Sequence, residues 1–151
     1  MFNISAQSKL NDIPVQELPS NVKMVVQEYI HILKNANSLE DCAKKMIKVA
    51  GGGLINESTS YVTLRNSIKP YSLKKDFNNI KFYAQPIIIT RVNVSKNRTS
   101  GYGESAIKGT IYKVWIGKKE GVNGMPAPIS ILVPQNHKII KSPKIIGIGS
   151  L

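Results

Sequence analysis

The spacing of the apolar residues changes at a glycine triplet, residues 51–53, and this change limits the chain to few architectures. Before the triplet, apolar residues recur every three or four positions, which is the spacing of amphipathic helices. After it, short runs rich in Ile and Val alternate with glycine-containing connections, which is typical of strands joined by turns. Because the two patterns occupy separate parts of the chain, we expect an α+β fold, with N-terminal helices packed on a curved antiparallel sheet.

The helical part of the chain divides into two helices. The first is expected over residues 20–36, with Ser20 or Asn21 as its N-cap. Its apolar residues form one stripe: Val22, Val25, Val26, Tyr29, Leu33 and Ala36. The second is expected to follow Ser38, a capping residue with an acid, Asp41, three positions later. We expect the glycine triplet to end this second helix, because glycine accepts the left-handed conformation common at helix C-termini.

The rest of the chain predicts mainly strands. The expected elements are, in order, a strand over 61–64, a short helix over 71–80, and strands over 81–94, 106–116, 127–133 and 138–148. Pro86 indicates a bulge or an edge in the first long strand, because proline cannot donate to a sheet ladder. Two glycine-containing connections, residues 95–105 and 117–126, are expected to join the three longer strands.

Residues 1–19 predict an extended N-terminal arm, since Pro14 and Pro19 oppose a helix there. Two interpretations of the arm stay open: a frayed terminus, or a segment that orders against a neighbouring subunit. Residues 20–151 are expected to form one α+β domain, because their length suits a single hydrophobic core.

The order of these elements resembles the nuclear-transport-factor-2-like superfamily, which includes the SnoaL-like domains. The stretches that carry the resemblance are the paired helices before the glycine triplet, the helical stretch before KFYAQPIIITRVNV, the segments GTIYKVWIGKK and APISILVP, and the closing HKIIKSPKIIGIGSL. The resemblance implies a cone, in which a strongly curved antiparallel sheet wraps around N-terminal helices. Enzymes of that superfamily usually place His, Asp, Tyr or Arg inside the cone, but no such set can be carried over to this sequence.

The composition also resembles that of small structural proteins of crAss-like tailed bacteriophages. The shared features are an extended arm, a compact α+β body, many Lys, Asn and Ile residues, and long glycine-containing loops. This resemblance implies a place in a virion.

Charge is distributed unevenly along the chain. Residues 1–57 have no net charge, whereas residues 58–151 account for the whole formal charge of +12. The candidate residues for contact with an anion or a partner are Arg91, Lys96, Arg98, Lys113, Lys118, Lys119, Lys138, Lys141 and Lys144. They have two interpretations: a basic surface that meets an anionic partner, or a solvated surface that reflects a lysine-rich, AT-rich genome. Strand alternation places Trp115 in a core or an interface rather than beside these cations.

The remaining chemistry-bearing residues predict neither a metal site nor a cofactor site. The chain has two histidines, His31 and His137, and one cysteine, Cys42, so we expect no metal centre and no internal disulfide. Cys42 lies on an apolar helix face, which predicts a buried core thiol. Asp76 is either a surface acid that pairs with a neighbouring lysine or, less simply, an acid at the mouth of the cone.

Two glycine motifs resemble phosphate-binding loops only superficially. These are the triplet at residues 51–53 and Gly101-Tyr102-Gly103. A phosphate-binding loop of the common type precedes a helix that begins with Lys-Ser or Lys-Thr, and neither motif does. Both are expected to be turns.

Together these features predict a non-catalytic structural or interaction subunit of a larger assembly, such as a neck, tail-ring or capsid accessory protein of a bacteriophage virion. Its expected partners are other protein subunits, in a homo-oligomer or hetero-oligomer, with nucleic acid as a further contact of the basic surface. The sequence begins without a signal-peptide pattern and has no apolar run long enough to span a bilayer. We therefore expect it in the host cytoplasm during assembly and then in the virion.

Two alternatives from other classes stay open. The first is a nucleic-acid-binding protein that uses the basic surface, and the second is a cone-pocket binder of small ligands or an enzyme.

Overall fold

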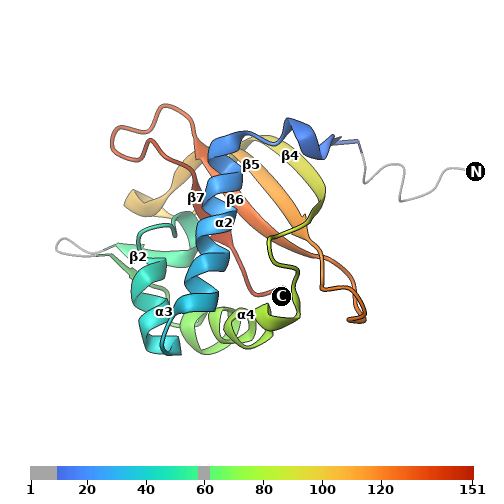
Figure 1. Cartoon of the computed structure of the whole chain (residues 1–151). Coiled ribbons are helices and arrows are strands. Elements are labelled where there is room, and N and C mark those ends of the chain that lie inside the picture. Colours follow the sequence, from blue (N-terminus) through green and yellow to red (C-terminus); the bar gives the residue numbers. More distant parts are fainter. Residues whose placement is uncertain (1–9, 58–61) are drawn as a thin grey trace, which may run out of the picture.

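The computed structural model of the chain describes residues 10–57 and 62–151, and it confirms the α+β class. Five antiparallel strands form one sheet in the order β1-β4-β5-β6-β7, and β2 and β3 form a separate small sheet (Figure 1). The strands of the large sheet are β1 (Asp12–Ile13), β4 (Ile89–Ser100), β5 (Ile107–Ile116), β6 (Ala127–Pro134) and β7 (Lys144–Gly147). The small sheet consists of β2 (Ile55–Glu57) and β3 (Val62–Leu64).

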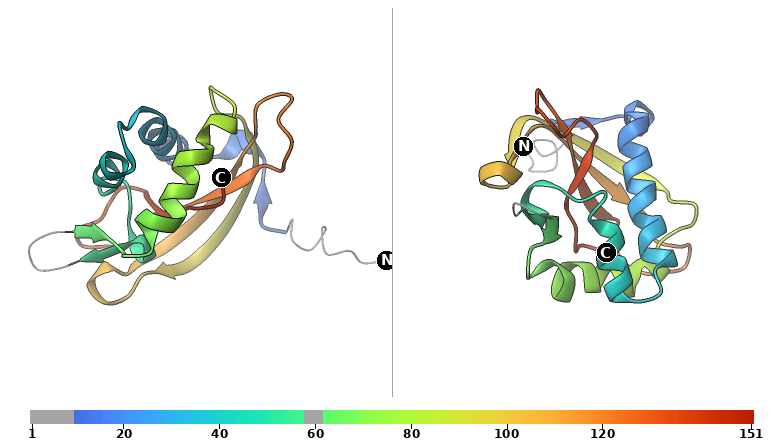
Figure 2. Two further views of the ribbon diagram at one scale, coloured as in Figure 1. Left: turned by 90° about the horizontal axis from the view of Figure 1, so that it is seen from below. Right: turned by 90° about the vertical axis from the view of Figure 1, so that its left-hand side faces the viewer.

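Three helices lie on one face of the large sheet: α2 (Ser20–Asn35), α3 (Leu39–Met46) and α4 (Lys74–Asn79) (Figure 2, left). A π-helical turn, Ile68–Leu73, precedes α4, and a 3₁₀ turn, Ile80–Phe82, follows it. We call this side of the sheet the helix side and the opposite one the outer face. None of the helices in the described part of the chain combines the length and apolar character that crossing a bilayer needs.

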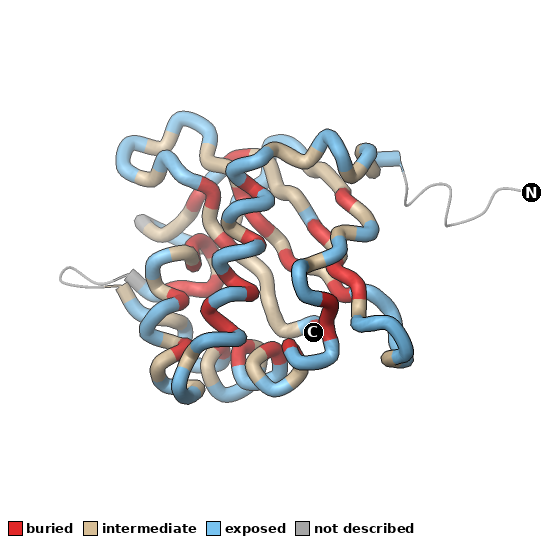
Figure 3. The backbone as a smooth tube through the Cα atoms, in the orientation of Figure 1, coloured by how far each residue is buried: buried red, intermediate tan, exposed pale blue. Residues whose placement is uncertain are grey.

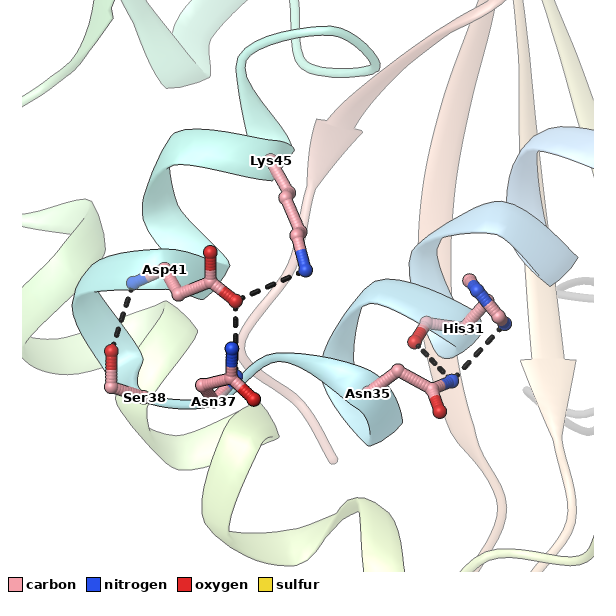
Figure 4. A network of polar contacts seen from close by, with 6 residues as sticks. All are labelled: His31, Asn35, Asn37, Ser38, Asp41 and Lys45. Carbon is pink, nitrogen blue, oxygen red and sulfur yellow. Dashed lines mark hydrogen bonds and ion pairs between the residues drawn. The ribbon is translucent and has the colours of Figure 1, made fainter.

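The two predicted N-terminal helices form, but their ends differ from the prediction. The cap position of α2 is occupied by Pro19, whose side chain accepts no hydrogen bond, so the cap expected at Ser20 or Asn21 is wrong. The cap of α3 is as predicted, because the Ser38 hydroxyl accepts a 3.1 Å hydrogen bond from the Asp41 amide (Figure 4). Helix α3 ends at Met46, several residues before the glycine triplet.

The segment between α3 and the glycine triplet extends the sheet instead of the helix. The Ile145 amide of β7 donates to the Val49 carbonyl at 2.7 Å, and the Gly51 amide donates to the Ile145 carbonyl at 2.9 Å. Ala50 and Ile145 thus form a parallel bridge across 95 residues of sequence. The ladder that β7 supplies is the physical reason why the helix stops early.

The hydrophobic core lies between the helices and the sheet (Figure 3). From the helices it takes the stripe that the sequence predicts, including the fully buried Val22, Val26 and Tyr29. From the sheet it takes the alternate residues of three strands: Val114, Ile116, Ile129, Ile131 and Ile145. Cys42 is fully buried in this core, as predicted.

Strand β4 differs most from the sequence-based expectation. It begins at Ile89 rather than at residue 81, and it continues to Ser100 through a stretch that we expected to be a connection. The register between β4 and β5 shifts twice, between Ile89 and Arg91 and between Ser95 and Arg98. Each shift places one extra residue in β4, which is the signature of a β-bulge.

Part of the predicted arm lies on the sheet. Asp12 and Ile13 pair with Asn93 and Val92 of β4, so β1 is the edge strand next to β4. The 3₁₀ turn Val15–Glu17 then leads into α2. The described half of the arm thus packs on its own chain, while the prediction for residues 1–9 lies outside the described residues.

Candidate functional site

The fold gathers three of the predicted cationic residues, Arg91, Arg98 and Lys113, on the outer face of β4 and β5. Pairing registers define this face. Arg91 lies opposite Trp115, and Arg98 lies opposite Gly109, two alternate positions along β5 from Lys113. The core residues Val114 and Ile116 point the other way. Three of the cations that the sequence singles out therefore lie on the same face of the sheet.

Arg91 is held in place by Asp12 on β1 and Trp115 on β5. Its Nε donates to both carboxylate oxygens of Asp12 on β1, at 3.1 and 2.9 Å. Asn93 donates to the same carboxylate through Nδ2 at 2.9 Å. The guanidinium carbon also lies 4.3 Å from the centre of the Trp115 ring, within the range of a cation–π contact. Arg91 is thus part of a fixed polar cluster.

Trp115 lies half-buried on the outer face beside Arg91, so of its two predicted places, a core or an interface, the core is wrong and the interface stays a prediction. Its ring lies under Arg91 and 5.8 Å from the Lys113 ammonium. Residues of β5 alternate between the two faces as expected, but the face that carries Trp115 is the outer one. Tyr112, Val114 and Ile116 point to the helix side instead. An indole on the outer face also stabilises cations there, because its π-system is electron-rich.

A hollow of about 380 Å³ lies on the outer face beside this cluster. Arg98 and Lys113 line it, together with the polar residues Asn93, Ser95, Thr99 and Ser130. Its remaining lining residues are Ile111, Ile146 and Gly147. We call it the outer-face hollow. None of the described acidic side chains forms an ion pair with Arg98 or Lys113, so these charges are available to a partner.

The other predicted cations do not line the outer-face hollow. Lys96 borders a neighbouring hollow between β1 and β4, which it shares with Arg98. Lys118 donates to the Asn123 carbonyl at 3.4 Å and lies 5.7 Å from the Tyr83 ring. Lys119 lies exposed in the same connection.

The three C-terminal candidates lie near β7. Lys141 donates to the His137 carbonyl, and Lys144 donates at 3.0 Å to the Lys48 carbonyl after α3. Lys138 is exposed. Two of these three lysines therefore bond to backbone carbonyls of the chain itself, which is a structural role.

Asp76 is fully buried, so the expectation of a surface acid paired with a neighbouring lysine is wrong. Its carboxylate accepts hydrogen bonds from the Tyr29 hydroxyl at 2.5 Å, the Gly149 amide at 2.9 Å and the Leu151 amide at 3.0 Å. The acid thereby joins α4 to α2 and to residues 149–151. We call this set the Asp76 cluster.

Burial raises the pKa of Asp76, because removal from water disfavours the charged form. The hydrogen bonds from Tyr29, Gly149 and Leu151 act in the opposite direction, since they stabilise the carboxylate. Burial and the nearby Asp76 charge also raise the pKa of the Tyr29 hydroxyl well above its usual value. A raised pKa is a common sign of a catalytic acid, but here the carboxylate is bonded by its own chain.

The remaining candidates for chemistry have structural environments. Burial raises the pKa of the Cys42 thiol to about 11, which keeps it in the poorly reactive protonated form. His31 is exposed and hydrogen-bonds to Asn35 on the next turn of α2 (Figure 4). Within residues 10–57 and 62–151, no three His, Cys, Asp or Glu side chains group in a way that could hold a metal ion.

The two glycine motifs meet in space as closely packed turns. The Gly53 amide donates to the Ser100 hydroxyl at 2.9 Å. A Cβ at Gly101 would lie 2.9 Å from the carbonyl carbon of Gly52, and both glycines have positive φ angles, 93° and 54°. Glycine is therefore needed for close approach as well as for conformation.

The comparisons with known proteins give no relative to set beside these observations. No family model matches the chain, and neither does any curated protein or solved structure.

Proposed function

We propose that this chain is a non-catalytic interaction subunit of a larger assembly and that its outer face contacts an anionic partner. The observation that carries this proposal is the pair of cations Arg98 and Lys113 on the outer face of β4 and β5, beside Arg91, whose charge is paired with Asp12. A surface with an excess of positive charge attracts and orients an anionic partner.

The arm and two loops supply apolar contacts for the same assembly. Each of these segments exposes one large apolar side chain: Leu10 at the start of the described arm, Tyr102 after β4 and Met125 before β6, with exposed fractions of 77%, 83% and 83%. Large apolar side chains are favoured at protein interfaces, where their burial contributes to affinity. They support the expectation that the arm and the two connections contact neighbouring subunits.

The assembly that we propose is a bacteriophage virion, in which the chain would be a neck, tail-ring or capsid accessory protein. Its support is the sequence resemblance in composition and organisation, together with a surface that combines charge and exposed apolar residues. In this setting the neighbours of the chain are other protein subunits, identical or different, and the packaged nucleic acid is a further anionic partner.

The test of the outer face is elution from an immobilised polyanion. We expect the R98Q/K113Q variant to elute from a heparin column at clearly lower salt than the unchanged protein. The matched control is K118Q/K119Q, which removes the same charge from a different surface and should elute close to the unchanged protein. Equal shifts of the two variants would show that net charge alone governs binding and would contradict the proposed surface.

The test of assembly is the mass in solution. Light scattering after size-exclusion chromatography at rising protein concentration is expected to give masses above the 16.7 kDa of one chain. The variant with serine at positions 10, 102 and 125 should stay nearer to the mass of one chain. A constant single-chain mass for the unchanged protein would contradict self-assembly.

A further inference from the structure

We infer that the outer-face hollow binds the phosphate groups of a single-stranded nucleic acid. This inference rests on the proposed function, because it names the chemistry of the anionic partner that the outer face contacts. It is argued from the backbone of β4, the donors around the hollow and the spacing of the two cations.

A β-bulge directs Arg98 into the hollow. From Ser95 to Arg98, β4 advances by three residues, whereas its partner β5 advances by only two, from Ile111 to Gly109. Side chains alternate between the faces of a strand, so without the extra residue Arg98 would point to the helix side. Asn97, inside the bulge, has a φ of 57°, in the left-handed region that Asn tolerates better than most residues. Bulges of this kind commonly redirect a side chain toward a site.

The donors around the hollow match a phosphate group. The two cations share the hollow with two serines of the same face, Ser95 and Ser130, which pair with Ile111 and Lys113 of β5. Arginine, lysine and hydroxyl side chains are the groups that most often contact phosphate oxygens. None of the lining residues of the hollow is acidic, and Asp12 on the neighbouring strand β1 accepts from Arg91 and Asn93.

The spacing of the cations suits a chain of phosphates better than one phosphate. Arg98 lies opposite Gly109, and Lys113 is four residues further along β5. Four residues of strand span about 13 Å. A polynucleotide that follows β5 can meet the two cations with two different phosphates.

An exposed aromatic side chain, Tyr102, follows Arg98 by four residues in the connection after β4, where it lines a separate hollow with Gly52, Gly53 and Arg65. Tyr102 follows the end of β4 and is 83% exposed, whereas the Trp115 ring is covered by Arg91. Exposed aromatic rings beside a basic groove bind single strands by stacking on their bases, without sequence preference. This feature favours a nucleic acid over an acidic peptide.

The experiment measures binding of a fluorescent twelve-residue oligothymidylate to the full chain by anisotropy, over a range of salt concentrations. Each phosphate contact contributes about 0.7 to the slope of log affinity against log salt for single strands. We expect R98Q/K113Q to lower the slope by about 1.4 and K118Q/K119Q to leave it nearly unchanged. Circular dichroism melting shows whether the variants remain folded.

Two further measurements distinguish a nucleic acid from an acidic peptide as the anionic partner. Y102S should weaken oligothymidylate binding about tenfold, because it removes a stacking surface. Polyglutamate of the same length should compete at least tenfold less well than the unlabelled oligonucleotide. Equal competition by polyglutamate, or an unchanged slope in R98Q/K113Q, would overturn the phosphate inference but leave the proposed anionic interface standing. Failure of the outer-face variants to change heparin elution would instead contradict the proposed function itself.

Discussion

Charged side chains have different environments on the two sides of the large sheet. On the helix side, Asp76 is the one charged residue that is fully buried among those described, and its carboxylate is bonded within the chain. On the outer face, Asp12 and Arg91 pair with exposed fractions of 20% and 35%, and two further cations line a hollow. Where water is excluded, a charge must be satisfied by the chain itself. Where water reaches, a charge stays available to a partner.

The largest expected effect comes from removing the buried carboxylate. Asp76→Ala leaves the Tyr29 hydroxyl and two backbone amides without their acceptor, so we expect a loss of about 3–5 kcal/mol in the free energy of unfolding. Asp12→Ala makes the same chemical change on the outer face and should cost about 1 kcal/mol or less. Urea denaturation followed by circular dichroism measures both values. Similar losses would mean that the contrast between the two sides is wrong.

Removal of one donor from the Asp76 cluster should have an intermediate effect. Tyr29→Phe keeps the ring in the core but deletes the hydroxyl that donates to Asp76, and we expect a loss of about 2 kcal/mol. The loss should nearly vanish when Tyr29→Phe is made in the Asp76→Ala background, since the acceptor is then already absent. A double-mutant cycle by urea denaturation measures this coupling, and strictly additive losses would count against the cluster.

The pH dependence of stability tests the charge on Asp76. Because burial raises its pKa above the ordinary value of 3.8, the native state keeps a proton that the unfolded state has already lost. The contribution of this group to stability is therefore fully present below pH 3.8 and is lost as the pH rises through the native pKa. One proton corresponds to at most about 1.4 kcal/mol per pH unit.

The measurement compares the unfolding free energy of the unchanged protein and Asp76→Asn between pH 3.5 and 7. Other carboxylates, such as Asp41 with its lowered pKa, give slopes of the opposite sign in both proteins and cancel in the difference. The unfolding free energy of the unchanged protein, relative to that of Asp76→Asn, should fall as the pH rises through the native pKa of Asp76. A difference that is constant with pH would show that Asp76 titrates as an ordinary acid.

The smallest effect is expected on the outer face. Arg91→Met removes the pair with Asp12 and the cation–π contact with Trp115, and we expect a loss of about 1 kcal/mol at low salt. In 1 M sodium chloride the loss should shrink, because salt screens exposed charges, whereas the loss caused by Asp76→Ala should persist. Thermal or urea denaturation at both salt concentrations measures the change. Loss of the same size at both concentrations would place Arg91 among the buried interactions.

Local patterns in the sequence predict much of the fold correctly. The first helix ends within one residue of its predicted bounds, the Ser38 cap forms, and β5 begins one residue after its predicted start. These features depend on neighbours in sequence: the helical stripe, the capping residue and the alternation of Ile and Val. Elements of this kind are readable without knowledge of the partner strand.

Features that depend on distant residues were predicted wrongly. Residues 95–99 are polar and read as a loop, but β5 supplies a ladder that extends β4 to Ser100. The bulge then reverses the alternation that would have placed Arg98 on the helix side. Asp76 follows two lysines, a pattern typical of a surface acid, but its donors at Gly149 and Leu151 lie 73 and 75 residues away. No local pattern carries that information.

The bridge between Ala50 and Ile145 has a consequence for the order of events during synthesis. Helices α2 and α3 leave the ribosome first, but their apolar sides pack against strands that are made about 95 residues later. At a translation rate of about 5–20 residues per second, those sides stay uncovered for about 5–20 seconds. A single amphipathic helix of this length is marginal in water. The nascent chain therefore passes through a period in which chaperone binding competes with aggregation.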